Sequence, residues 1–306
     1  MAIRAIIIGR LVNRNRKKNK TVSSVIILGK NSYIGRYLSN YLECNGQTNL
    51  IALSSKDCDL LNYDDVANRF SVLTKNDSTI VFLSAINRSV DNSFQSFKKN
   101  TEMVKNFVDN AKLLNVRSII YLSSVDVYGK NSDLPITENT SINPDTWYGL
   151  SKYVCEWILR ESEGLNCPIA ILRIPGIFGY SPGDKSVIGR MVSTIKSENR
   201  IYIHGDGQAM RDYVSIDDLS RLITELIPLK YNGVLNIATG QSRSVLEISL
   251  LISRILFLNY DMVHLSAGGG RDFDLSFDNR KIGEVLPDFI FEELTVGINS
   301  YLSSEK

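Results

Sequence analysis

The chain has 306 residues, of which 43% are hydrophobic and 22% charged, and its formal net charge is +2. This length is enough to bury a full core, as one large α/β domain or as a domain with a smaller lobe. A net charge near zero gives no bulk electrostatic reason to expect nucleic acid or a membrane surface as a partner. Two histidines, and four cysteines without Cys-x-x-Cys spacing, disfavour a histidine triad, a metal site and a disulfide scaffold, and predict a reducing cytoplasm.

The first residues have an unusual pattern of charge. A short apolar run at 5–8 is flanked by Arg4 and Arg10 and followed by a basic stretch at 14–20. It lacks the unbroken apolar segment of a signal peptide and the roughly 20 apolar residues of a membrane span. We expect residues 1–22 to form a solvated basic leader, with nucleic acid or anionic lipid as its less favoured partner.

From Ser24 onward, short apolar runs alternate with amphipathic stretches. The runs, rich in β-branched residues, are 25–28, 50–53, 80–83, 119–122 and 169–172. This alternation predicts a Rossmann-type, doubly wound parallel sheet. After Arg173 the alternation of apolar runs and amphipathic stretches becomes less regular. We therefore expect a dinucleotide-binding domain over 23–173, to which the chain returns at about 212–228, and a smaller mixed α/β substrate lobe over 174–306.

A glycine-containing loop follows the first predicted strand and opens a helix, as a dinucleotide-binding loop does. Its sequence is Gly29-Lys30-Asn31-Ser32-Tyr33-Ile34-Gly35. Gly29 would make the tight turn and Gly35 would let helix and strand pack closely, with a pyrophosphate at the helix N-terminus. Ser32 replaces the usual middle glycine, and its hydroxyl could donate to a phosphate. A glycine-rich turn with no ligand is the alternative.

The end of the second strand bears on the choice of cofactor. An acidic residue there would accept hydrogen bonds from the adenosine ribose and favour NAD, but the strand ends in Leu53-Ser54-Ser55-Lys56. Lys30, Lys56 and the serine hydroxyls could receive a 2′-phosphate. We therefore predict NADP(H), with NAD as the alternative, and expect Asp59 and Leu60 to cover the adenine.

Three residues further along form a predicted catalytic set. Tyr148 and Lys152 are four residues apart in a predicted helix, so they share a face, and Ser124 ends a predicted strand 24 residues before Tyr148. The lysine ammonium would favour the ionised phenol, which matters because free tyrosine has a pKa of about 10. Ser124 would hold the substrate oxygen while Tyr148 moves a proton. The set predicts a hydride-transfer site.

Ordered motifs extend over residues 24–300. Besides the glycine loop and the Tyr148/Lys152 pair, they are Asp59-Leu60, 123–129, Asn143-Pro144, Gly205-Asp206-Gly207, 211–214, 236–240 and Arg271-x-x-Asp274. In combination they resemble the extended short-chain dehydrogenase/reductase family, specifically its nucleotide-sugar epimerases, dehydratases and 4-ketoreductases.

The resemblance implies roles for single residues. Ser84 and Ala85 would line the nicotinamide ribose, Asn100 would support the helix beneath it, and Pro175 would border the nicotinamide. The remaining cofactor-binding residues would be Gly29, Asn31, Ser32, Tyr33, Ile34, Gly35, Ser54, Lys56, Asp59, Leu60, Tyr148 and Lys152.

The resemblance also implies a nucleotide-diphosphate sugar as substrate. Arg211 and Arg271 match two arginines that grip its diphosphate, for which a guanidinium fork is suited. A structural salt bridge, such as Arg271 with Asp274, is the alternative for either arginine alone. Arg88 lies in a loop on which sugar choice would depend. A homodimer joined through helices at about 93–114 and 146–163 is implied, and the apolar residues compatible with it are Val104, Phe107, Val108, Val154 and Ile158.

The residues after Ser124 bear on the reaction. Where sugar 4,6-dehydratases carry Thr-Asp-Glu, this chain has Ser124-Val125-Asp126. Val125 cannot protonate a leaving hydroxyl, which disfavours dehydration. Asp126 is either a second acid/base or a polar residue at a strand end.

The leading prediction is an NADPH-dependent reductase of a 4-keto nucleotide-diphosphate sugar, which makes a deoxyhexose precursor for surface polysaccharide. The serine in the glycine loop and the missing acid at the second strand favour an exchangeable NADPH. An NAD-dependent nucleotide-sugar 4-epimerase is the first alternative. A non-catalytic NAD(P)-sensing regulator is the second, disfavoured because both Tyr148 and Lys152 are present.

Overall fold

The computed structural model describes residues 24–73, 77–130, 133–179, 186–256, 263–266 and 273–304. The predicted leader at 1–22, the loop at 180–185 and Arg271 lie outside these residues.

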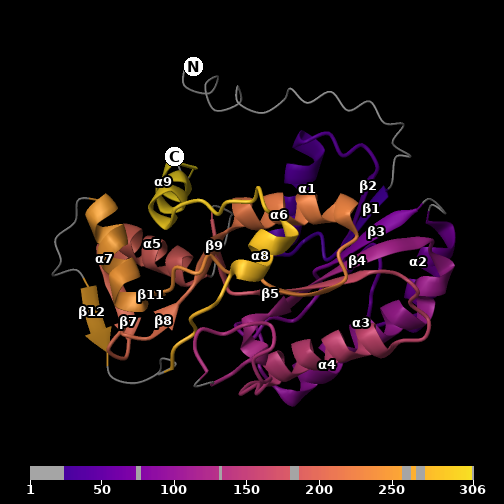
Figure 1. The fold of residues 1–306 in the computed structure, drawn as a ribbon, viewed down its shortest axis with the longest axis horizontal. Coiled ribbons are helices and arrows are strands. Elements are labelled where there is room, and N and C mark those ends of the chain that lie inside the picture. The colour runs from indigo at the N-terminus through magenta and orange to yellow at the C-terminus, as the bar shows by residue number, and fades with distance from the viewer. Residues whose placement is uncertain are drawn as a thin grey trace.

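A six-stranded parallel sheet forms the centre of the larger part of the fold (Figure 1). Its strand order is β10-β5-β4-β3-β1-β2. The strands are β1 (Ser24–Leu28), β2 (Leu50–Leu53), β3 (Ser78–Phe82), β4 (Val116–Ser124), β5 (Ile169–Ile174) and β10 (Gly233–Asn236). The first five coincide with or overlap the five predicted apolar runs, so the predicted Rossmann-type sheet is confirmed.

Helices cover both faces of this sheet (Figure 1). One face carries α1 (Tyr33–Cys44), α6 (Ile216–Leu229) and α8 (Arg280–Val285), and the other carries α2 (Tyr63–Val72), α3 (Phe94–Asn110) and α4 (Trp147–Glu161). Because side chains alternate along a strand, Val25 and Ile27 enter one core while Ile26 and Leu28 enter the other. Burial on both faces explains why the strands are continuous apolar runs.

The sixth strand comes from a part of the chain that the sequence placed in the C-terminal lobe. After α6, β10 adds to the sheet edge beside β5, with Val234 opposite Ile171. The chain therefore stays with the sheet beyond the predicted return at about 212–228. β10 was missed because its four residues include a glycine and an asparagine, which are depleted in strands.

The remaining elements build a smaller lobe around a separate core. Its short strands pair in twos: β6 with β9, β7 with β12 and β8 with β11. The elements are β6 (Gly176–Phe178), α5 (Val187–Glu198), β7 (Ile201–His204), β8 (Met210–Arg211), β9 (Tyr213–Ser215), β11 (Arg243–Ser244), α7 (Val245–Ile255), β12 (Val263–Ser266) and α9 (Leu294–Ser304). Two short 3₁₀ helices, η2 (Ala111–Leu113) and η3 (Val125–Val127), follow α3 and β4. None of the helices in the described ranges is long and apolar enough to cross a membrane.

Candidate active site

The loop after β1 has the backbone shape that a dinucleotide requires. Gly29 has a φ of +104°, and a Cβ on Gly35 would lie 2.2 Å from the Gly29 carbonyl oxygen. The Ser32 hydroxyl caps α1 by accepting from the Gly35 amide at 2.9 Å, and it donates to the Gly29 carbonyl at 2.8 Å. Here the one hydroxyl proton of Ser32 goes to Gly29, and donation to a phosphate stays a prediction.

The other predicted residues of the loop have structural contacts. The Asn31 carbonyl accepts from the Arg36 guanidinium at 2.7 Å. Tyr33 donates to the Gly179 carbonyl at 2.8 Å and so links the loop to the residue after β6. Ile34 packs against the core beneath α1.

A cavity of about 120 Å³ lies at the carboxyl ends of β1 and β2. It brings together five predicted cofactor residues, while neither Lys30 nor Lys56 lines it. The lining residues are Leu28, Gly29, Leu53, Ser54, Ser55, Cys58, Asp59, Leu60, Leu61, Ser84 and Met103. With the glycine loop beside it, this hollow is the candidate site for the adenosine half of a dinucleotide.

Asp57 is a carboxylate at the end of β2 that the sequence analysis missed. Its Oδ2 accepts from the Ser54 hydroxyl at 2.6 Å and from the Ser54 amide at 2.9 Å. These hydrogen bonds lower the pKa of Asp57, and nearby Lys30 lowers it further. The turn folds Asp57 back onto Ser54, so a carboxylate lies near this strand end, although Asp57, like Lys30 and Lys56, is not among the residues that line the cavity. An acid that reached the adenosine ribose would favour NAD over NADP.

The predicted catalytic residues meet at the carboxyl end of β4. Tyr148 and Lys152 on α4 are 8% and 3% exposed, and Ser124 at the end of β4 is 7% exposed. The Lys152 ammonium donates to the Leu122 carbonyl at 2.6 Å. It also lies 4.8 Å from the centre of the Tyr121 ring and 5.8 Å from that of Tyr148. The structure thus brings together the three residues that the sequence placed in one set.

Burial decides the protonation of this set. It raises the pKa of Tyr148 well above 10.0, and the Asp126 carboxylate raises it further, while Arg88 and a hydrogen bond with Ser124 act in the opposite direction. Burial also lowers the pKa of Lys152 to about 8. Burial has the largest effect on the pKa of Tyr148, and the expectation that Lys152 favours the ionised phenol stays a prediction. At neutral pH the phenol keeps its proton and is suited to give it to an alkoxide.

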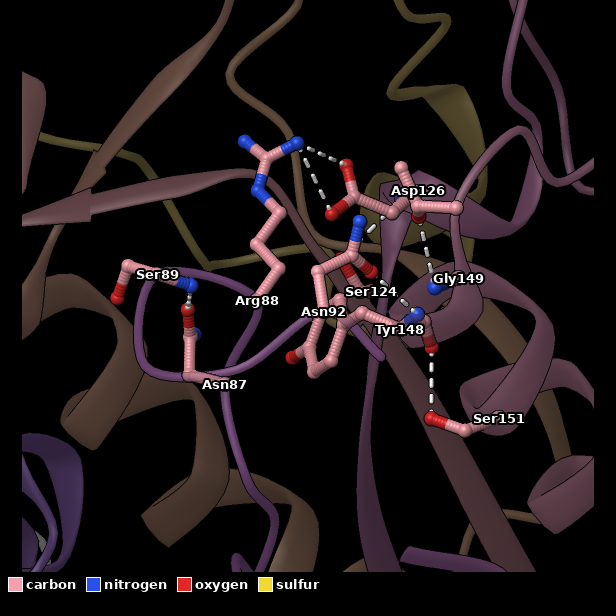
Figure 2. Close-up of polar contacts among 10 residues, drawn as sticks. Asn87, Arg88, Ser89, Asn92, Ser124, Asp126, Tyr148, Gly149 and Ser151 are labelled. Atoms are coloured by element: carbon pink, nitrogen blue, oxygen red, sulfur yellow. Dashed lines mark hydrogen bonds and ion pairs between the residues drawn. The ribbon is translucent and has the colours of Figure 1, made fainter. Parts of the chain in front are cut away.

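Asp126 forms an ion pair with Arg88 above the tyrosine (Figure 2). One guanidinium nitrogen of Arg88 lies 3.3 Å from both carboxylate oxygens. The Asp126 side chain is 6% exposed and that of Arg88 is 44% exposed. The Asp126 amide donates to the Ser124 hydroxyl at 3.1 Å. Since both charges shift the pKa of Tyr148, the pair belongs to the electrostatics of the site.

The loop that carries Arg88 is fixed at both ends. The Asn100 side chain bonds the amide and carbonyl of Ile86 at 2.7 and 3.1 Å, and also donates to the Ser151 hydroxyl on α4 at 3.1 Å. Asn92 accepts from the Tyr148 amide at 3.0 Å (Figure 2). These contacts place Asn100 as a support between the loop and α4.

The other predicted residues are less closely joined to this centre. Ala85 is half-buried in the loop that carries Arg88, and Pro175 is half-buried between β5 and β6. On β8, Arg211 donates to the carbonyls of Met210 and Phe273, each at 2.6 Å, and its guanidinium lies 5.7 Å from the centre of the Phe273 ring. Arg271 lies outside the described residues, so its pairing with Arg211 stays a prediction.

Comparison with known proteins identifies the family. A model of the NAD dependent epimerase/dehydratase family matches residues 25–238. The chain belongs to this family. The match covers the whole central sheet except the first residue of β1, and it includes the Tyr148 and Lys152 pair.

Relatives with different reactions resemble the chain. A dTDP-4-dehydro-6-deoxyglucose reductase from Escherichia coli is 31% identical over 209 residues, 63% of each chain. A UDP-glucose 4-epimerase from Yersinia enterocolitica is 28% identical over 221 residues, 63% of this chain and 66% of its own. Both matches span just under two thirds of the relative's length. The solved dTDP-glucose 4,6-dehydratase of Bacillus anthracis, in complex with NAD, has a TM-score of 0.79 and 17% identity over 92% of this chain and 96% of its own. At that identity the likeness shows the fold alone.

Proposed function

We propose that this protein reduces the 4-keto group of a nucleotide-diphosphate sugar to a hydroxyl, with NAD(P)H as hydride donor. The observation that carries the proposal is the burial of Tyr148 beside Ser124 and Lys152, which raises the pKa of the phenol. A ketone that accepts a hydride becomes an alkoxide and needs one proton. A phenol whose pKa is raised supplies that proton rather than removing one.

Each residue has a role in this reaction. Bound NAD(P)H supplies the hydride for C4. Ser124 holds the C4 oxygen, Tyr148 gives it a proton, and Lys152 holds the cofactor ribose. Val125 leaves the site without the acid that dehydration needs. The product would be a deoxyhexose nucleotide sugar, and its use in surface polysaccharide, like a cytoplasmic location, stays a prediction.

A 4-epimerase is the second candidate, and Asp57 is the observation that favours it. An epimerase retains its cofactor and usually uses NAD, and a carboxylate at the end of β2 suits the ribose hydroxyls of NAD better than a phosphate. The NADPH preference predicted from the sequence stays a prediction beside this alternative. NADPH binding would require Lys30 or Lys56 to turn toward the cavity.

The first experiment is to denature the purified protein and identify any released nucleotide by mass spectrometry. Stoichiometric NAD(H) would favour the epimerase. A nucleotide-free protein that oxidises NADPH or NADH when given a 4-keto sugar nucleotide would support the reductase. Binding of neither cofactor would contradict both proposals.

Tyr148→Phe should reduce turnover at least 100-fold and leave NAD(P)H affinity nearly unchanged, because the ring stays and only the proton donor is lost. Turnover can be followed by nicotinamide absorbance and affinity by calorimetry. Tyr41→Phe, on α1, is the matched control and should behave as the wild type. Unchanged turnover of Tyr148→Phe would exclude the proposed proton donor.

A further inference from the structure

A fully buried carboxylate lies directly behind the catalytic set. Glu156 is on α4, four residues after Lys152, and is 0% exposed. Its two oxygens accept from the Arg173 guanidinium at 3.1 and 2.7 Å. One of them also accepts a very short hydrogen bond from Ser123. The reaction proposed above uses none of these three residues.

Glu156 contacts Ser123, the residue directly before Ser124. Ser123 and Arg173 are opposite each other in the β4 and β5 ladder. By bonding both, Glu156 ties α4 to the ends of the two strands. Arg173 also donates to the Tyr128 hydroxyl at 2.8 Å, and Tyr128 follows η3, which carries Asp126. The Glu156–Arg173 ion pair therefore helps to hold together α4 and β4, the two elements that carry the catalytic side chains.

Glu156 also acts on the charge of Lys152. The titratable groups that face the Lys152 ammonium are Tyr121 from β4, and Tyr148, Cys155 and Glu156 from α4. Burial raises the pKa of both tyrosines and brings the pKa of the Cys155 thiol to about 11, so these groups are neutral near pH 7. Of these four groups in the described part of the chain, the Glu156 carboxylate is the one that bears a negative charge.

We propose that Glu156 is a positioning residue, whose charge keeps the Lys152 ammonium protonated while its hydrogen bonds fix the strand end that carries Ser124. The link to catalysis rests on the proposed function. The effect on Lys152 does not, because it involves only residues of this chain. Burial opposes the ammonium, and the nearby carboxylate offsets part of that effect.

The test is a pH titration of Lys152 by NMR on the full chain labelled with ¹³C at the lysine ε-carbon. The Lys152 signal is the one that disappears in Lys152→Met. In Glu156→Gln the pKa of Lys152 should fall by about half a unit or more, because a buried positive charge loses its opposite charge. In Arg173→Gln it should rise, because Glu156 is then uncompensated. Tyr128→Phe removes a hydrogen bond to Arg173 without changing charge, and should leave the pKa in place.

If the pKa of Lys152 shifts in opposite directions in Glu156→Gln and Arg173→Gln, a merely structural role of the ion pair is excluded. If the ion pair only held the fold together, either variant would loosen the site, and the pKa of Lys152 would rise toward 10.5 in both. That result would overturn the proposal. If Glu156→Gln does not fold, the double variant Glu156→Gln/Arg173→Gln leaves no unpaired buried charge and should still lower the pKa of Lys152. A pKa at or above the wild-type value in the double variant would also overturn it.

The same variants link Lys152 to catalysis. If the proposed reaction is correct, the alkaline fall of kcat/KM should move to lower pH in Glu156→Gln and to higher pH in Arg173→Gln. Because the titration needs no substrate, a failure of the proposed reaction would leave the NMR result intact. The two failures are therefore distinguishable.

Discussion

At the scale of single residues, the active site is governed by desolvation. Burial makes the ionised forms of Tyr148 and Lys152 less stable, so the pKa of the tyrosine rises and that of the lysine falls to about 8. Both shifts favour the neutral side chain. The tyrosine is thereby ready to donate a proton, while the lysine keeps its charge only below about pH 8.

The buried lysine should lower the stability of the fold. Its pKa is about 8 when folded and about 10.4 when unfolded, so between these values the unfolded chain binds more protons and stability rises with pH. Below pH 8 the buried ammonium destabilises the fold to its full extent. Lys152→Met should therefore raise the free energy of unfolding by about 1 to 3 kcal/mol at pH 7, the lost bond to Leu122 reducing the gain.

Urea unfolding at pH 7 and pH 10 would check this prediction. The advantage of Lys152→Met over the wild type should shrink as the pH approaches 10.4. An advantage that is the same at both pH values would show that packing, and not the ammonium, causes it. Turnover of the variant should be lost at every pH.

Asp57 should control the choice between the two cofactors. Its carboxylate, fixed by two hydrogen bonds to Ser54, would repel a 2′-phosphate. Asp57→Asn should shift the ratio of NADPH to NADH affinity toward NADPH by about 10-fold. Calorimetry with both cofactors measures the ratio. Glu43→Gln, on α1, removes another exposed acid and should leave the ratio unchanged.

At the scale of elements, the site depends on how closely α4 approaches η3. Gly149 allows this approach, since a Cβ there would lie 2.4 Å from the Asp126 carbonyl oxygen. The helix starts at this contact, with the Thr146 hydroxyl accepting from the Gly149 amide at 3.0 Å. One glycine thus sets the distance between Tyr148 and the segment that carries Ser124 and Asp126.

Gly149→Ala should therefore separate these two elements. We expect a loss of about 2 kcal/mol or more in stability and a fall in turnover. Gly283→Ala, on α8, is the control, because a Cβ there would meet no atom within 4 Å and alanine favours helix. Thermal unfolding of both variants would test this, and equal stability of the two would contradict it.

At the scale of the whole molecule, α3 and α4 leave apolar side chains in solvent. Trp157, Phe94 and Trp147 are 56%, 49% and 42% exposed. Of the residues named from the sequence for a dimer contact, Val104 and Phe107 are instead buried in the core, at 1% and 0% exposed. The spacing of Val104 and Phe107 therefore marks the side of α3 that packs against the sheet.

The homodimer stays a prediction, now placed on the exposed residues of α3 and α4. A stable dimer would bury these side chains in an interface of about 800 Å² per protomer or more. Trp157→Glu should then give a monomer in analytical ultracentrifugation. Val72→Glu, which changes a still more exposed apolar residue on α2, should not alter the mass. A wild-type protein that is already monomeric would refute the prediction.

The sequence by itself determined the features that depend on neighbours in the chain. Apolar runs define the first five strands, Gly29 and Gly35 define the cofactor turn, and the four-residue spacing puts Tyr148 and Lys152 on one face. Only the tertiary structure decided the features that depend on distant residues. β10 becomes a strand because β5 offers an open edge, and Tyr148 keeps its proton because the packed fold removes water from the phenol. Asp57 reaches Ser54 through a local turn, since the two residues are only three apart in the chain, and this contact was overlooked rather than hidden from the sequence. The physical reason is that strand pairing and desolvation are set by what packs around a residue, whereas periodicity and local turns are set by the residue's own segment.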